Sequence, residues 1–109
     1  MEYLFNSRGQ HIANFVNGQL HAPLGQNIGH FLEDQKIFID MSGNYLGEIV
    51  QNNRLMYNSI SPHRNVCYGS YGSYKNLGSY IDPGSNENIG TVSGYEDIAT
   101  PWLKKHLIG

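Results

Sequence analysis

The chain has 109 residues, enough for one domain, and a domain of this length can fold without disulfides or a bound metal. Charged residues make up 15% of the chain, against about 25% typically, and the net charge is −2. This balance argues against a nucleic-acid-binding surface. No apolar run approaches the ~18 residues of a membrane span, and Met1-Glu2-Tyr3 does not resemble a signal peptide. Because Cys67 is the one cysteine, no internal disulfide can form, and we expect a reducing, cytoplasmic setting.

An internal repeat is the main signal in the sequence. Each copy has Gly, two polar or aromatic residues, Ile or Leu, Gly or Ala, a polar residue and two apolar residues. The clear copies begin 16 and 18 residues apart, at Gly9–Val16, Gly25–Leu32 and Gly43–Val50, and degenerate copies follow at Asn76–Ile81 and Asn88–Val92. This spacing is too short for helical-hairpin repeats and predicts one β-hairpin per unit.

Turn chemistry independently predicts the hairpins. Asn6-Ser7-Arg8-Gly9 and Asp40-Met41-Ser42-Gly43 have the residue choice of a type I turn with a bulge, in which the Asn or Asp side chain accepts backbone N–H bonds. Ala22-Pro23-Leu24-Gly25 is a weaker version because Ala22 cannot accept. Asn17-Gly18 is a strong two-residue hairpin signal. Strands of five to seven residues are therefore expected from Tyr3 to about Asn58.

A small residue recurs in the middle of the predicted strands, where another backbone usually comes close. We therefore expect the hairpins to converge on a common axis. The small residues are Ala13, Gly29, Gly47, Gly78 and Gly90.

The Asp/Asn-x-x-Gly-x-x-Ile/Leu-Gly-x-Ile/Phe-Val/Leu repeat resembles that of the bacterial four-fold β-flower domain family, over about Tyr3–Val92. The resemblance implies an all-β ring of four antiparallel β-hairpins around a pseudo-four-fold axis. It implies no activity and no catalytic residues. The sequence departs from the family in its fourth unit, where an insert replaces the tight turn.

We assign residues 1–109 to a single domain. It has hairpin repeats at 3–58, followed by a Tyr/Gly/Ser-rich insert at 59–75. Closing strands are expected at 76–92 and a short C-terminal helix at 100–108. Thr100 can cap that helix, and Pro101 suits its first position. Trp102 and Leu107 are expected to pack against the sheet.

Signatures of enzymes are mostly absent, and the sequence predicts no catalytic residue, no metal site and no cofactor. His11 and His30 occupy polar repeat positions that we expect to be solvated, whereas His21 is expected on an inward or interface face. Cys67 is expected to be a small buried hydrophobe rather than a nucleophile or zinc ligand. Asp40 is assigned as the turn acceptor. Glu96 and Asp97 are expected to be solvated acids before the helix.

The insert carries the candidate contact residues: His63, Arg64, Tyr68, Tyr71 and Tyr74. Tyrosines spaced among Gly and Ser offer amphipathic contact area, so they suit a protein partner, a glycan or a subunit contact. The simpler expectation, which we favour, is that they are buried as a lid over one end of the ring or make a contact between subunits.

We predict a non-catalytic interaction or accessory module that binds a protein partner or forms a homo-oligomer. The alternative is a small ligand- or glycan-binding domain, or an enzyme, with a pocket near His63, Arg64 and Cys67.

Overall fold

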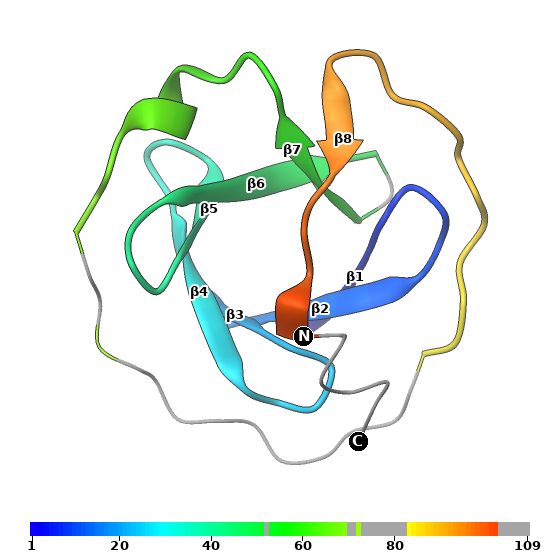
Figure 1. Cartoon of the computed structure of the whole chain (residues 1–109). Helices are drawn as coiled ribbons and strands as arrows, with labels where there is room; N and C mark the ends of the chain where they lie inside the picture. The colour runs from blue at the N-terminus through cyan, green and yellow to red at the C-terminus, as the bar shows by residue number, and fades with distance from the viewer. Residues whose placement is uncertain (52, 70–71, 73–82, 103–109) are drawn as a thin grey trace.

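In the part of the chain that the structure describes, eight short strands and one 3₁₀ helix follow one another (Figure 1). The computed structural model describes residues 1–51, 53–69, 72 and 83–102. The elements are β1 (Glu2–Phe5), β2 (His11–Val16), β3 (Gln19–His21), β4 (Asn27–Leu32), β5 (Ile37–Asp40), β6 (Tyr45–Val50), β7 (Arg54–Asn58), η1 (Pro62–Asn65) and β8 (Tyr95–Asp97). The prediction of an all-β chain is confirmed.

The strands form one sheet in chain order, each antiparallel to the next, and the sheet closes into a seven-stranded barrel through a parallel β1–β7 pairing. Phe5 N donates to Asn53 O over 2.9 Å at this closure. The buried Arg54 side chain fills the seam, with Nη1 donating to Asn6 O at 3.1 Å and to Glu87 O at 2.7 Å. One edge of β7 pairs with β6, and its other edge is shared by two strands. On that edge Arg54 pairs with β1, and Met56–Asn58 pair with β8.

This closure differs from a ring of four hairpins, because β8 pairs with β7 alone and stands outside the closed barrel. The long chain between β7 and β8 leaves β1 next to β7, so the seventh strand completes the barrel. Residues 83–92, where closing strands were expected, run without strand pairing, and 76–82 lie outside the described residues. The expected strand appears instead at Tyr95–Asp97.

The predicted turns are confirmed in the first three hairpins. Gly9, Gly25 and Gly43 have φ of 87°, 102° and 90°, and each backbone N–H donates to the carbonyl three residues earlier. Asn6 Oδ1 and Asp40 Oδ1 each accept two backbone N–H bonds at 2.9–3.0 Å. The assignment of Asp40 as a turn acceptor is therefore correct.

The first three hairpins also share a bulge and a small residue opposite an apolar one. The bulges follow Leu4, Leu20 and Phe38, and the residues paired with these are Ala13, Gly29 and Gly47. A Cβ at Gly29 or at Gly47 would meet the backbone carbonyl oxygen of Ile39 or of Met56. The expected close approach of another backbone is thus present at both glycines.

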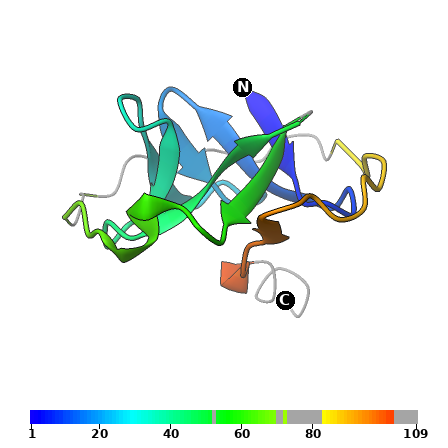
Figure 2. The ribbon, with the colours of Figure 1, turned by 90° about the horizontal axis from the view of Figure 1, so that it is seen from above.

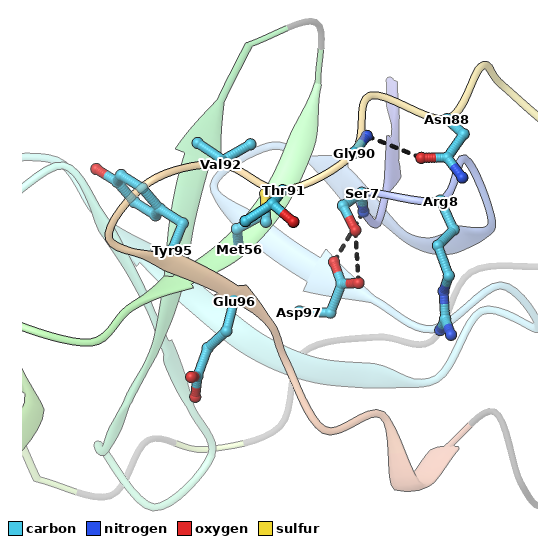
Figure 3. A pocket seen from close by; sticks show the side chains of 10 residues that line it. All are labelled: Ser7, Arg8, Met56, Asn88, Gly90, Thr91, Val92, Tyr95, Glu96 and Asp97. Carbon is cyan, nitrogen blue, oxygen red and sulfur yellow. Dashed lines mark hydrogen bonds between the residues drawn. The ribbon is translucent and has the colours of Figure 1, made fainter.

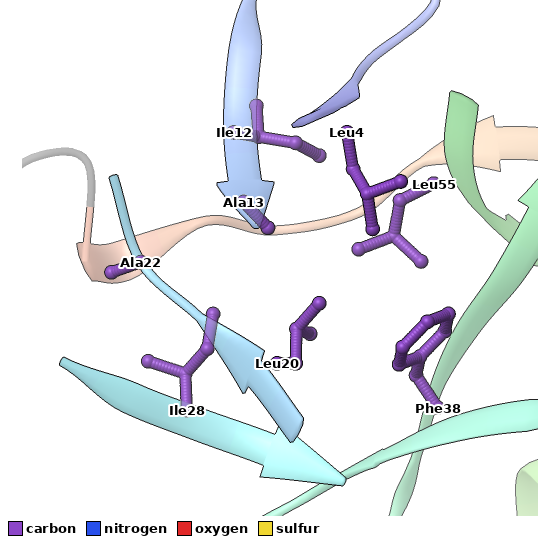
Figure 4. Close-up of a cluster of buried hydrophobic side chains, with 8 residues drawn as sticks. All are labelled: Leu4, Ile12, Ala13, Leu20, Ala22, Ile28, Phe38 and Leu55. Atoms are coloured by element: carbon purple, nitrogen blue, oxygen red, sulfur yellow. The ribbon is translucent and has the colours of Figure 1, made fainter. Parts of the chain in front are cut away.

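The barrel interior is filled by apolar side chains from six of its strands and one turn (Figure 4). They are Leu4, Ile12, Ala13, Leu20, Ala22, Ile28, Phe38 and Leu55. After β8 the chain crosses the end of the barrel shown in Figures 1 and 2, where Ile98 and Trp102 pack on this core. Trp102 Nε1 donates to Ile12 O over 2.8 Å, so its expected packing on the sheet is confirmed. Pro101 and Trp102 have helical backbone, and the rest of the predicted helix, with Leu107, lies outside the described residues.

The chain between β7 and β8 is attached to two equivalent turns. Tyr68 N donates to Gly43 O over 2.9 Å, and Asn86 N donates to Gly9 O over 2.8 Å. The chain after β7 and the chain before β8 are thus fixed to the third and first hairpins by the same type of backbone bond.

Candidate functional site

Residues Ser59–Gly69, which we call the η1 segment, lie outside the barrel beside the β5–β6 hairpin (Figure 1). Ser61 holds the segment in place. It is 2% exposed, its Oγ accepts from His63 N at 3.2 Å, and its carbonyl accepts from Arg64 Nη1 at 2.8 Å. Asn44 and Cys67 form a β-bridge at the far end. Proline and an N-cap serine at the start of η1 explain the tight turn locally.

Two of the predicted contact residues meet in this segment. His63 Nδ1 and the Tyr68 hydroxyl share a hydrogen bond, and their ring centroids are 6.0 Å apart. Tyr68 is half-buried and packs against a second apolar cluster, formed by Ile37, Ile39 and Tyr45. Arg64 lies on the same turn and is exposed. Tyr71 and Tyr74 lie outside the described residues.

Cys67 is exposed, and the expectation that it is buried is wrong. Its thiol donates to Ser42 O over 3.4 Å, while His63 turns to Tyr68. The residue is exposed because the η1 segment projects from the barrel instead of entering its core. The described contacts of His63 and Cys67 do not form a thiol–imidazole pair.

The segment carries a feature that the sequence reasoning missed. Ile60 is 76% exposed and Val66 is 43% exposed, on a backbone that hydrogen bonds fix at both ends. Ile60 N donates to the Asn58 side chain at 3.1 Å. Large apolar side chains on either side of Pro62-His63-Arg64-Asn65 were the available signal, because that polar turn cannot itself cover them.

A carboxylate joins β6 to β8 beside this segment. Glu48 accepts from the Tyr45 hydroxyl at 2.8 Å and from the Tyr95 hydroxyl at 3.0 Å. Burial raises the pKa of Tyr45, and the adjacent Glu48 raises it further. The pKa of Tyr95 is raised by the same two causes. Both phenols therefore stay protonated and donate to Glu48. The Tyr95–Glu48 hydrogen bond links β8 to β6.

The polar repeat positions differ from expectation. His30 is 4% exposed, so the prediction of a solvated side chain is wrong, and burial lowers its pKa. His11 is half-buried, with Nε2 bonded to Asn14 Oδ1 at 2.8 Å and its ring against Tyr3. The position equivalent to His30 in the first hairpin, Asn14, is also fully buried, so this repeat position faces the protein and not the solvent. His21 is buried, as predicted for an inward or interface position, and contacts Gly25 O.

Within the ranges 1–51, 53–69 and 83–102, no three His, Cys, Asp or Glu side chains gather as metal ligands. No helix in those ranges is long and apolar enough to cross a membrane. Comparison of the chain with protein families, curated proteins and solved structures found no match.

Proposed function

We propose that this chain is a non-catalytic interaction module, in which the barrel is a scaffold and the η1 segment contacts a protein partner. The observation that carries the proposal is the exposure of Ile60 and Val66 on an ordered backbone. Both side chains are on one short, hydrogen-bonded segment, and an exposed apolar surface is the feature that a protein partner would cover. Because hydrogen bonds already fix the segment, little conformational freedom is lost when a partner binds.

Arg64 extends the proposed surface with a positive charge. It is exposed between Ile60 and Val66 in the chain, and arginine is among the residues enriched at protein interfaces. The partner surface should therefore combine an apolar pocket for Ile60 with a carboxylate or carbonyl acceptor for Arg64. His63 and Tyr68 support the surface from below rather than acting as free contacts, since they bond to one another.

The proposal is tested by placing a photo-crosslinking residue at position 60 and irradiating cells of the organism that makes the protein. The same residue at position 24 is the matched control. Leu24 is also strongly exposed but lies in the β3–β4 turn, away from the η1 segment. We expect a discrete cross-linked protein from position 60 and none from position 24, and its mass distinguishes a second copy from another protein. Equal products at both positions, or none at positions 60 and 66, would contradict the proposal.

We further propose that β7 and β8 are a fourth, diverged copy of the hairpin repeat, as in a four-fold β-flower. Support comes from register: Met56 pairs with Asp97 as Leu4 pairs with Ala13.

We also propose a reducing, cytoplasmic setting for the protein, because an exposed lone thiol such as Cys67 persists best where disulfides are rare.

A further inference from the structure

A cavity of about 430 Å³ lies where β8 meets the first turn and residues 88–92 (Figure 3). Its lining combines the buried Met56 and the half-buried Val92 with charged side chains from Arg8, Glu96 and Asp97. The volume falls within the ~300–1,000 Å³ range of small-molecule sites. No part of it belongs to the η1 segment, so the cavity is independent of the proposed partner surface.

Asp97 is held rigidly in this cavity. Ser7 N donates to Oδ1 over 2.8 Å, and Ser7 Oγ donates to Oδ2 over 2.7 Å (Figure 3). Asp97 pairs with Met56 at the register position where the first three hairpins have Ala13, Gly29 and Gly47. A carboxylate oxygen has two lone pairs, so each oxygen of Asp97 can accept a further hydrogen bond from a ligand.

Arg8 brings the opposite charge to the same cavity without neutralising Asp97. The carboxylate of Asp97 turns to Ser7, and the side chain of the exposed Arg8 extends away from it in Figure 3. Glu96, the neighbour of Asp97 on β8, is exposed, and its side chain points away from the Asp97 carboxylate in Figure 3, as expected for successive residues of a strand. The cavity thus presents one cation, Arg8, and one anion, Asp97, that do not pair with each other.

We propose that this cavity binds a small zwitterion of the α-amino acid class. The ligand carboxylate would pair with the guanidinium of Arg8, which can hold it through two parallel N–H bonds. The ammonium would donate to Asp97, and the apolar side chain would lie against Met56 and Val92. A ligand with both charges satisfies both sides of the cavity, whereas a purely cationic or anionic ligand satisfies one and is repelled by the other.

Three probes of equal chain length test the charge requirement: L-norvaline, pentylamine and valerate, with glycine as the smallest zwitterion. Each is titrated into the ¹⁵N-labelled protein, and amide shifts of Ser7, Thr91 and Glu96 report binding at the cavity. We expect norvaline to bind at least about tenfold more tightly than either singly charged probe. Pentylamine or valerate binding as well as norvaline, or neither zwitterion shifting these amides, would overturn the proposal.

Arg8→Gln separates the two ligand charges. We expect it to weaken norvaline binding about tenfold or more and to leave the binding of pentylamine no weaker. The matched control is Lys36→Gln, which neutralises an exposed lysine outside the cavity and should leave norvaline binding unchanged. Equal effects of the two variants would show that net charge, not the cavity, governs binding, and would also overturn the proposal.

Discussion

The first three hairpins and the β7–β8 pair follow the same register but carry different residues. In the first three, a glycine turn joins the strands and a small residue faces an apolar one. In β7–β8, residues 59–94 separate the strands and Asp97 takes the place of the small residue. Asp97 fastens β8 to the first turn through Ser7, instead of allowing a neighbouring strand to approach.

This difference shows where a repeat protein has room for chemistry. Three of the units already supply six of the seven strands of the barrel, so their positions are constrained by closure. Strand β7 completes the barrel, and the chain after β7 is free of that constraint. This part of the chain carries the exposed η1 segment and contributes β8 and Asp97 to the charged cavity.

The largest expected effect comes from adding one methyl group to a constrained position. In Gly29→Ala the new Cβ meets the backbone carbonyl of Ile39, which cannot move without disturbing β5. We expect the free energy of unfolding to fall by about 2–3 kcal/mol, as for other overpacked cores. Urea unfolding followed by circular dichroism measures it.

Alanine is the native residue at the equivalent position of the first hairpin, which gives the control. Ala13→Gly removes a methyl group and should cost only about 0.5–1 kcal/mol, through backbone entropy. If Gly29→Ala is neutral instead, the β4–β5 spacing is adjustable and the two hairpins are interchangeable at this position.

The next largest effect tests the two hydrogen bonds between Ser7 and Asp97, the residue that stands where the other hairpins have a small residue. Asp97→Ala restores the residue type found at Ala13 but removes both acceptors of Ser7. Hydrogen bonds to charged groups contribute about 1.5–3 kcal/mol, so we expect a loss of about 2 kcal/mol in unfolding free energy. Asp40→Ala, which removes an exposed turn acceptor, is the comparison and should cost less. No loss in Asp97→Ala would mean that the bonds to Ser7 contribute nothing, and that pairing with β7 and the Tyr95–Glu48 hydrogen bond are enough to hold β8.

Local features of the fold could be predicted from sequence, and features that depend on distant contacts could not. The turns at Gly9 and Gly43 depend on four consecutive residues, and they were predicted correctly. Closure between β1 and β7 depends on where Arg54 finds its partners, which no local pattern encodes. The sequence also does not show that Asp97 accepts hydrogen bonds from Ser7, because the two residues are far apart in the chain.

The candidate site shows the same division. His63 and Arg64 were identified because Pro-His-Arg interrupts the repeat, and that interruption is local. The exposure of Cys67 and Ile60 depends on the η1 segment projecting beside the β5–β6 hairpin, so it required the structure.

A smaller effect concerns how the stability of the protein depends on pH through His30. His30 occupies the repeat position of Asn14, and its burial lowers its pKa. Since the unfolded state then takes up a proton more readily than the folded state, stability is lost as pH falls below about 6.5. We expect His30→Asn to flatten the fall in unfolding free energy between pH 7 and 5, by less than the loss in Asp97→Ala. Parallel curves for the two proteins would show that His30 does not contribute to acid sensitivity.

The smallest expected effect on stability concerns the surface that the barrel does not need. Ile60→Ser should change the free energy of unfolding by no more than about 0.5 kcal/mol, because a side chain that is 76% exposed contributes little to packing. The same substitution at Ile28, inside the barrel, should cost several times more, since it removes apolar burial from the core. Urea midpoints of the two variants measure the contrast. A loss above about 1 kcal/mol in Ile60→Ser would place this side chain in the packing of the fold, and the exposed surface proposed for a protein partner would lose its main support.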